Sequence, residues 1–445
     1  MEQNTELFEK IRKQFDFGPY PRVPIEKTPE DEFEKLYLHN LTTAYYLRNR
    51  QFISPESKLI LDAGCGSGYK SLILAHANPG AKIVGVDISE KSVELAKLRL
   101  QHHGFSNVDF FTLSIEDLSE LNLQFDYINC DEVLYLMPDV NKALQVMTSV
   151  LKPNGIIRTN LHSSLQRFVY YRVQKLFQLM GLMDDNPEEM EIGIVREIFD
   201  SLQDTVFLKN SAGEVEKPGK EPKTDEQILA NYLLQGDKGY TIPELFRALE
   251  DANLELISMT NYRQWDIKAL FKDPENLPVF LSLSLPEATI EEQLHLFELL
   301  QPVHRLLDIW CGHQGESQPF IPVSEWTDED WQAATVYIHP QLTTPQVEAE
   351  LKQCFQQLRP FSISQFLPIT GVSPSALDIT VTACVIPPLL KSPQSLASLV
   401  ERWLQVQPLN LETLEPNQPE DIFKHLQSLL LGLEASGYVM LVQGS

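Results

Sequence analysis

The sequence has few cysteines, no excess of positive charge and no long apolar run. Its 445 residues include five cysteines that form no CxxC pair, which argues against a disulfide framework or a zinc ribbon. The 36 Lys and Arg face 62 Asp and Glu, and a net charge of −26 does not suit a protein that neutralises phosphates. We therefore expect reduced thiols, no nucleic-acid partner and no binding to an anionic membrane surface.

Membrane insertion and export are not indicated either. The apolar stretches are far too short to span a bilayer, and the first residues lack the basic flank and apolar run of a signal peptide. Hydrophobic residues make up 43% of the chain, which is enough for a globular fold. At roughly 100 to 200 residues per domain, the length predicts two or three domains. The expected location is the cytoplasm.

The acidity is concentrated in two segments. Residues 184–226 hold 13 acids against 5 bases and residues 286–445 hold 19 against 6, whereas the remainder is nearly neutral. An acidic surface commonly does no more than keep a protein soluble. The alternative is that one of these segments docks on a basic partner, and the sequence leaves both interpretations open.

Short apolar runs alternate with helical stretches between residues 59 and 160. Such runs predict buried strands, and the stretches between them have the apolar spacing of helices. This alternation predicts an α/β fold with a doubly wound parallel sheet that has helices on both faces. The expected strands are 59–61, 83–86, 108–111, 127–130 and 155–159, and the expected helices lie near 69–77, 89–103 and 141–151.

The rest of the chain divides where its composition changes. We expect a helical arm first, then the core of the sheet, an acidic helical insertion that forms a cap, the end of the core, and a C-terminal accessory domain. Two helices and a closing strand predict an α+β, winged-helix-like fold for that last domain, and its acidity argues against DNA binding. The expected boundaries are 1–55, 56–162, 163–240, 241–286 and 287–445.

Two local expectations belong to this division. The end of the core is expected to contain helix 243–252 followed by strands at 254–259 and 279–285. Within the cap, the Pro, Gly and Lys residues of 217–222 predict an exposed loop.

A glycine-rich turn follows the first expected strand, in the sequence LILDAGCGSGY from Leu59 to Tyr69. Gly64, Gly66 and Gly68 allow the backbone to pass close to a ligand, and the helix that begins there offers free N–H groups. The GxGxG spacing, with Asp62 two residues before the first glycine, fits a pyrophosphate cradle poorly because dinucleotide-binding folds use GxGxxG.

A carboxylate ends the second expected strand. Asp87 follows Gly68 by nineteen residues, and this position allows it to accept both hydroxyls of a ribose. Its alternative role is that of a turn residue before the helix that Ser89 caps.

These two motifs together resemble the class I S-adenosylmethionine-dependent methyltransferases, over residues 57–160 and 241–285. The resemblance implies a Rossmann-like sheet and S-adenosyl-L-methionine as the cofactor. It also implies that Asp62, Gly64, Gly66 and Gly68 line the cofactor pocket, that Cys65 contributes backbone, and that Asp87 holds the ribose with Ile88 beside it. The family often has an acidic residue after the third strand for adenine. Here Ser114-Ile-Glu-Asp117 leaves the choice open among Glu116, Asp117 and the backbone of Ile115.

Four side chains are candidates for catalysis. Asp131 and Glu132 follow the fourth strand, where ligands bind in open α/β sheets, although they equally suit the start of a helix. Tyr20 lies in Gly18-Pro-Tyr-Pro-Arg22, which is similar to the NPYPRW segment of some bacterial methyltransferases but lacks its Asn and Trp, and which also fits simple packing of an arm. His162 leaves the fifth strand at the same rim, with Asn160, and suits proton transfer unless it is structural.

A metal site is not expected. His304, Cys311 and His313 lack a fourth partner and lie among leucines.

The size of the chain beyond a methyltransferase core favours a protein side chain as the methyl acceptor. A narrower resemblance is to the cyanobacterial enzymes that N-methylate an asparagine of the phycobiliprotein β-subunit. The alternatives are a small-molecule methyltransferase with the aromatic segment Phe168–Phe177 as a lid, and a non-catalytic scaffold. The oligomeric state and the partner of the acidic segments are left open.

Overall fold

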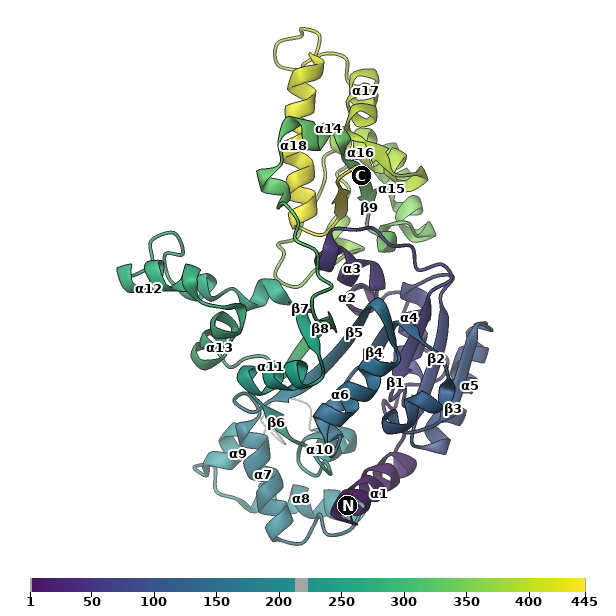
Figure 1. The fold of residues 1–445 in the computed structure, drawn as a ribbon, viewed down its shortest axis with the longest axis vertical. Coiled ribbons are helices and arrows are strands. Elements are labelled where there is room, and N and C mark those ends of the chain that lie inside the picture. Colours follow the sequence, from purple (N-terminus) through teal and green to yellow (C-terminus); the bar gives the residue numbers. More distant parts are fainter. Residues whose placement is uncertain (1, 213–222, 445) are drawn as a thin grey trace. The chain divides into compact units, whose positions relative to one another are not determined.

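The computed structural model describes residues 2–212 and 223–444 (Figure 1). The loop expected at 217–222 lies outside the described residues. The chain divides into two compact units, the first of 1–27, 58–72 and 81–316, and the second of 28–57, 73–80 and 317–445. The expected helical arm therefore contributes to both, because α1 (Glu2–Phe17) is in the first unit whereas α2 (Phe33–Leu38) and α3 (Leu41–Asn49) are in the second.

The first unit contains the expected sheet, with strand order β3-β2-β1-β4-β5-β8-β7. The strands from β3 to β5 pair in parallel, and β8 is antiparallel to both of its neighbours. The short strand β6 (Gly239–Tyr240) pairs with the end of β5. The other strands are β1 (Leu59–Ala63), β2 (Lys82–Asp87), β3 (Val108–Thr112), β4 (Phe125–Cys130), β5 (Leu151–Ser163), β7 (Leu254–Met259) and β8 (Leu306–His313).

The strand order reverses between β1 and β4, and this reversal places the ligand site. In an open α/β sheet a crevice forms at the carboxyl ends of the strands on either side of such a point. The glycine-rich turn follows β1, and Asp131 follows β4. The expected helices are present as α4 (Tyr69–Ala77), α5 (Glu90–His102), α6 (Val140–Ser149) and α11 (Ile242–Asp251), so the predicted doubly wound α/β class is confirmed.

The prediction of a strand at 279–285 is wrong. Residues Val279–Ser284 form helix α12 instead, and the sheet is completed by β8, which lies beyond the expected end of the core at residue 286. A short apolar run fits a strand or a helix equally well by periodicity, and here the helix forms.

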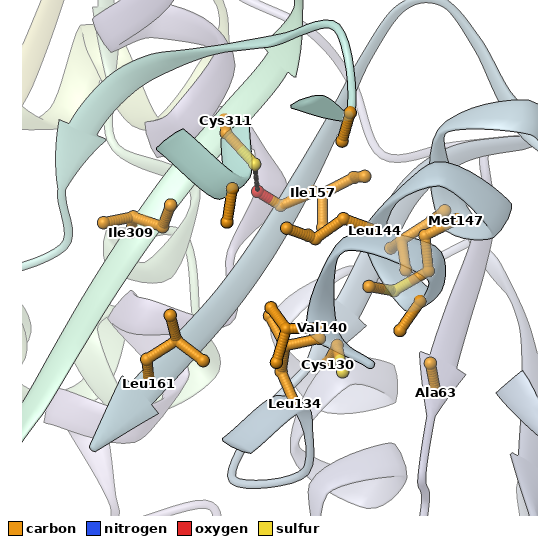
Figure 2. Close-up of a cluster of buried hydrophobic side chains, with 14 of the residues drawn as sticks. Ala63, Cys130, Leu134, Val140, Leu144, Met147, Ile157, Leu161, Ile309 and Cys311 are labelled. Atoms are coloured by element: carbon orange, nitrogen blue, oxygen red, sulfur yellow. Dashed lines mark hydrogen bonds between the residues drawn. The ribbon is translucent and has the colours of Figure 1, made fainter. Parts of the chain in front are cut away.

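Helix α6 covers the sheet with apolar side chains, as Figure 2 shows. Val140, Leu144 and Met147 from this helix are buried with Ile157 of β5 and Ile309 of β8 in one cluster. Each fully buried side chain of this size contributes about 1.5–3 kcal/mol. The five cysteines are buried, and the Cys311 thiol donates to the Ile157 carbonyl oxygen at 3.6 Å.

The segment expected as a cap is helical in its described part. It forms α7 (Phe168–Leu179), α8 (Glu189–Ser201), α9 (Phe207–Ser211) and α10 (Asp225–Asn231). These helices share a small core that includes Val173, Phe177, Phe199 and Tyr232. Helix α1 attaches to this region through Gln14, which receives a hydrogen bond from the backbone N–H of Gln235 at 3.2 Å.

The second unit contains a three-stranded antiparallel sheet with order β10-β9-β11 and its own apolar core. The expected pair of helices and closing strand are α17 (Leu396–Val406), α18 (Pro419–Ala435) and β11 (Val439–Val442). The remaining elements are α14 (Asp328–Ala333), β9 (Thr335–Ile338), α15 (Pro345–Gln357), α16 (Ile379–Lys391) and β10 (Gln394–Ser395). Within residues 2–212 and 223–444, no helix is both long and apolar enough to cross a membrane.

Candidate active site

A cavity of about 510 Å³ lies at the carboxyl ends of the parallel strands in the first unit. Its volume is in the range of roughly 300–1,000 Å³ that small-molecule sites have. The lining comes from α1, from the segment after it, from the turns that follow β1, β2 and β4, and from α10. Of the expected site residues, the lining includes Tyr20, Gly64, Cys65, Gly66, Asp87, Ile88, Ile115, Asp131, Glu132 and His162.

Two glycines of the turn are required for different reasons. Gly66 has φ +52°, and a β carbon on it would lie 2.1 Å from the carbonyl oxygen of Tyr20. Gly68 has φ +81°, and its β carbon would lie 2.5 Å from the Cα of Ala96 in α5. Gly66 therefore lets the turn lie against the Tyr20 segment beside the cavity. Gly68 is outside the lining, and it lets the start of α4 approach α5.

Asp87 is held by backbone groups at the edge of the cavity. Its carboxylate accepts hydrogen bonds from the N–H of Gly66 and the N–H of Ser89, both at 2.9 Å. Burial raises the pKa of Asp87, and the two hydrogen bonds oppose that shift. One carboxylate thus connects the ends of β1 and β2.

Asp62 and Glu116 are not in the lining, although both were expected to contact the cofactor. Asp62 lies behind the turn, where it accepts hydrogen bonds from the Ser71 hydroxyl at 2.6 Å and the Asn129 amide at 2.9 Å. Burial raises the pKa of Asp62 to about 6. Glu116 points away and pairs with Lys142. Asp62 therefore supports the turn from behind, outside the cavity lining.

The proline-bracketed segment that contains Tyr20 is fixed to the glycine-rich turn. The backbone N–H of Ser67 donates to the Tyr20 carbonyl at 2.9 Å, and the Ser67 hydroxyl donates to the Pro21 carbonyl at 2.7 Å. Arg99, which is buried in α5, donates to the carbonyls of Pro24 and Val23, both at 2.7 Å, and to that of Ser67 at 2.9 Å. These bonds hold Tyr20 at the mouth of the cavity.

The negative charge of Asp131 is balanced by two cationic side chains. It forms ion pairs with Lys70 and, at 3.5 Å, with Arg158, and it accepts a hydrogen bond from the Asn160 amide at 2.7 Å. Burial lowers the pKa of Lys70, but Asp131 and Glu132 raise it more, so the net shift is upward and this lysine stays charged.

Glu132 has a backbone conformation that is rare for its residue type. Its φ is +63°, and its side chain pairs with Arg305. The backbone N–H of Glu132 donates a hydrogen bond to the side-chain oxygen of Asn160 at 2.9 Å. Left-handed backbone at a non-glycine residue costs of order 1–3 kcal/mol and is concentrated at functional sites.

His162 is held in one orientation from three sides. Its Nδ1 lies 2.7 Å from a carboxylate oxygen of Asp237, its ring stacks on Tyr135 with centroids 3.6 Å apart, and its Nε2 lies 3.1 Å from Arg305. Burial lowers the pKa of His162 to about 4, although Asp237 opposes the shift, so the imidazole is neutral at pH 7. The neutral ring donates from Nδ1 to Asp237 and accepts at Nε2 from Arg305.

Lys70, Arg305 and Asp237 are among the charged residues of this site that were not predicted from the sequence. Lys70 immediately follows the turn. A lysine in the first turn of a helix opposes the helix dipole, and this unfavourable position could have indicated from the sequence that Lys70 has a role at the site. Arg305 lies after the expected end of the core. Asp237 lies in a short loop between α10 and β6, and no local pattern marks it.

No group of three His, Cys, Asp or Glu side chains suited to a metal ion occurs in the described part of the chain. Of the residues considered for such a site, His304 stacks on Trp265 and Cys311 is buried in the sheet core.

Comparison with known proteins connects this geometry to an activity. Residues 55–230 match the family model described as a methyltransferase domain. An uncharacterised protein of Synechococcus sp. is 28% identical over 319 residues, which are 71% of this chain and 73% of that protein. The ubiquinone biosynthesis O-methyltransferase of Bordetella avium is 30% identical over 144 residues, which are 32% of this chain and 58% of the relative.

Among solved structures, PKMT2 from Rickettsia typhi in complex with AdoHcy matches with a TM-score of 0.58 and 19% identity, over 96% of this chain and 77% of the other. At that identity the match shows a shared fold. The cavity beside the glycine-rich turn and the carboxylate at the end of β2 fit an adenosyl ligand. The chain is an S-adenosylmethionine-dependent methyltransferase with a Rossmann-like, class I core.

Proposed function

We propose that this methyltransferase acts on a side chain of a protein substrate. The cavity of about 510 Å³ has the size of a site for one small molecule, and it opens to the surface at its rim. Its rim includes Tyr20, which is 37% exposed, the half-buried Glu226 and the exposed Arg305. A thin side chain that reaches in from a larger molecule fits these dimensions.

The cofactor would occupy the half of the cavity formed by β1 and β2. Asp87 would accept the ribose hydroxyls, the turn from Gly64 to Gly66 would receive the methionine part, and Ile88 and Ile115 would enclose the adenine. Asp87 has two oxygens for this role, and they are already aligned by Gly66 and Ser89.

The acceptor would lie at the other end, among Tyr20, Asp131, Glu132 and His162. Methyl transfer from a sulfonium depends mainly on alignment of nucleophile, methyl and sulfur. An amide or hydroxyl acceptor must in addition lose a proton. Glu132 and His162 are the candidates to accept it. Asp237 fixes the tautomer of His162 that leaves Nε2 as an acceptor, but the lowered pKa makes this nitrogen a weak base, and Arg305 must first turn away from it toward Glu132.

The small-molecule alternative has less support. The lining extends from Ile11 to Arg305, a span of 305 − 10 = 295 positions, and the match to the ubiquinone enzyme covers 144 residues, so it includes less than half of that span. The aromatic segment 168–177, expected as a lid, contributes no residue to the lining. It is instead part of the core of the cap through Val173 and Phe177.

A carboxamide is the narrower hypothesis for the acceptor group. Its N–H would donate to a carboxylate such as Glu132, and its carbonyl would accept from Arg305 or Tyr20. The match to a cyanobacterial protein over 71% of the chain supports testing asparagine of the phycobiliprotein β-subunit first.

The test is transfer of radiolabelled methyl from S-adenosylmethionine into a lysate of the host that lacks this gene, separated by size. We expect label in one discrete protein band. Label in the small-molecule fraction alone would contradict a protein acceptor.

Hydrolysis of the labelled band then identifies the group. Acid hydrolysis of an N-methyl carboxamide releases volatile methylamine, whereas methyl-lysine retains its label and a methyl ester releases methanol in mild base. Label recovered as methyl-lysine would overturn the carboxamide hypothesis while leaving the protein acceptor in place.

A further inference from the structure

Six charged side chains of the first unit form a row of ion pairs in which the signs alternate. The members of this ion-pair row, in order, are Asp308, Arg158, Asp131, Lys70, Glu132 and Arg305. The nitrogen–oxygen distance is 2.7 Å from Arg158 to Asp308 and 3.5 Å from Arg158 to Asp131. These three are buried, and the last four members of the row line the cavity. The row therefore leads from the interior of the unit to the cavity.

Lys70 lies in the middle of the row and directly after the glycine-rich turn. It is the second residue of α4, a helix of nine residues whose positive dipole end is at the turn. A lysine at that end is unfavourable, because two positive features meet there. A negative group relieves the conflict, and Asp131 supplies one. An anion that enters the cavity beside the turn would meet the helix terminus and the lysine together.

The Lys70 ammonium can bind more than Asp131. An ammonium has three N–H donors. Among the residues that the structure describes, Lys70 donates one hydrogen bond, to Asp131, since the Glu132 carboxylate at 3.9 Å is beyond hydrogen-bond distance. The Lys70 side chain is 24% exposed and belongs to the cavity lining, so a second donor can reach a ligand.

The carboxylates beside Lys70 keep other partners when it turns one donor to a ligand. Asp131 retains its ion pair with Arg158, and Glu132 retains its ion pair with Arg305. Leaving a buried charge without any partner would be strongly destabilising. The ion-pair row avoids that cost, because each carboxylate beside Lys70 has a second cation.

The lining includes two further cationic side chains, Arg22 and Arg305, and both are placed elsewhere. Arg22 is exposed and its guanidinium lies against Gly18, where a β carbon would be 2.3 Å from one of its nitrogens. Arg305 contacts Glu132 and His162, at the end where we place the acceptor. Lys70 is thus the cation that adjoins the glycine-rich turn.

We propose that Lys70 binds the α-carboxylate of the methionine part of the cofactor. The cofactor has one carboxylate, and an anion inside a cavity needs a charged or hydrogen-bonding partner. Ammonium and carboxylate form a charge-assisted hydrogen bond, which is stronger than a neutral one. The inference rests on the orientation of the cofactor proposed above, with its methionine part at the turn from Gly64 to Gly66, and not on the nature of the acceptor. Lys70 thereby makes the site select adenosyl compounds that have an amino-acid carboxylate.

The experiment compares two ligands by calorimetry on the purified full chain. One is S-adenosylhomocysteine, and the other is its analogue with hydrogen in place of the carboxylate. A hydrogen bond to a charged group contributes about 1.5–3 kcal/mol, so the wild type should prefer the carboxylate by roughly 10- to 150-fold. Lys70→Met should lose this preference and should bind the analogue no worse than the wild type does. Lys70→Arg should keep part of the preference, because a guanidinium also binds carboxylates.

Two control variants separate contact from other effects. Arg305→Met removes the same charge from the lining, and it should keep the preference if direct contact rather than the general field is responsible. Lys142→Met removes a lysine that pairs with Glu116 outside the lining, and it should change neither affinity. If Lys70→Met does not fold, Lys70→Gln takes its place, because its amide can still donate to Asp131.

A wild type that binds both ligands equally would overturn the proposal, and so would a preference that survives in Lys70→Met. Loss of affinity for both ligands by the same factor would overturn it too, since that is the result of a purely structural lysine. A preference that Arg305→Met abolishes as fully as Lys70→Met would assign the effect to the general field instead. Neither ligand needs an acceptor, so each of these outcomes is independent of whether the acceptor is a protein.

Discussion

A β carbon on Gly66 would lie 2.1 Å from the carbonyl oxygen of Tyr20. The glycine-rich turn and the segment with the tyrosine are thus in direct backbone contact, and no other residue type fits between them. The neighbouring bond from Ser67 N–H to the same carbonyl fixes the pair. In the function proposed above, cofactor binding and acceptor entry both depend on this contact.

Substituting Gly66 should abolish cofactor binding while the protein stays folded. Gly66→Ala should push the Tyr20 segment away, and Gly66→Arg should also fill the cavity. We expect at least a 100-fold loss of affinity for S-adenosylmethionine by calorimetry. Gly104→Ala is the matched control, because Gly104 has φ +79° with no atom within 4 Å of its β carbon.

Both alanine variants place a side chain at positive φ, which costs about 1–2 kcal/mol of stability. Only Gly66→Ala should lose the cofactor. Unchanged affinity in Gly66→Arg would remove the turn from the site.

Asp87→Ala should weaken cofactor binding. A hydrogen bond to a charged group contributes about 1.5–3 kcal/mol, so we expect an increase in Kd of roughly 10- to 150-fold. A cofactor analogue without the ribose hydroxyls gives a sharper readout, since it should bind the wild type weakly and the variant no worse. If that analogue distinguishes the two proteins as strongly as the natural cofactor does, Asp87 does not hold the ribose.

Asp131→Asn and His162→Gln should lose turnover and keep their affinity for the cofactor. The reason is that both side chains line the end of the cavity where we propose that the acceptor binds, with Tyr20 and Glu132. Glu116→Gln is the control, because Glu116 lies outside the lining and pairs with Lys142. Methyl-transfer rates and calorimetry on the same preparations test this, and full activity in either variant would clear that residue of catalysis.

His162 should make the protein sensitive to acid. Its pKa is about 4 in the folded state and near 6.5 when unfolded, so the unfolded chain takes up a proton first as the pH falls. The stability is complete above about pH 6.5 and declines toward pH 4 by up to about 1.4 kcal/mol per pH unit.

The side chain of His162 is only 1% exposed, so this effect is not screened by solvent. Between pH 7.5 and pH 5, His162→Gln should lose about 2 kcal/mol less free energy of unfolding than the wild type. Denaturant titrations at the two pH values measure the difference. Equal losses in both proteins would show that His162 does not titrate as described.

Much of the fold was predictable because local rules decide it. Apolar runs alternating with helical spacing placed the strands from β1 to β5, and the motif from Asp62 to Gly68 with Asp87 located the crevice. Tyr20, Asp131, Glu132 and His162 were expected at the site, and all four line the cavity.

The errors have one physical origin, which is long-range context. Val279–Ser284 is apolar enough for a strand, but β8 occupies the place in the sheet between β5 and β7. Arg305 enters the site only because β8 begins next to it, and Asp237 only because α10 and β6 bring its loop to His162. The sequence around these two residues has no feature that predicts their positions.

The most direct test of the central claim is methyl transfer by the purified chain into a lysate that lacks its gene. Wild type, Gly66→Arg and Gly104→Ala should be assayed together with labelled S-adenosylmethionine. We expect one labelled protein band with wild type and Gly104→Ala, and none with Gly66→Arg. Label confined to small molecules, or a labelled band that persists with Gly66→Arg, would contradict it.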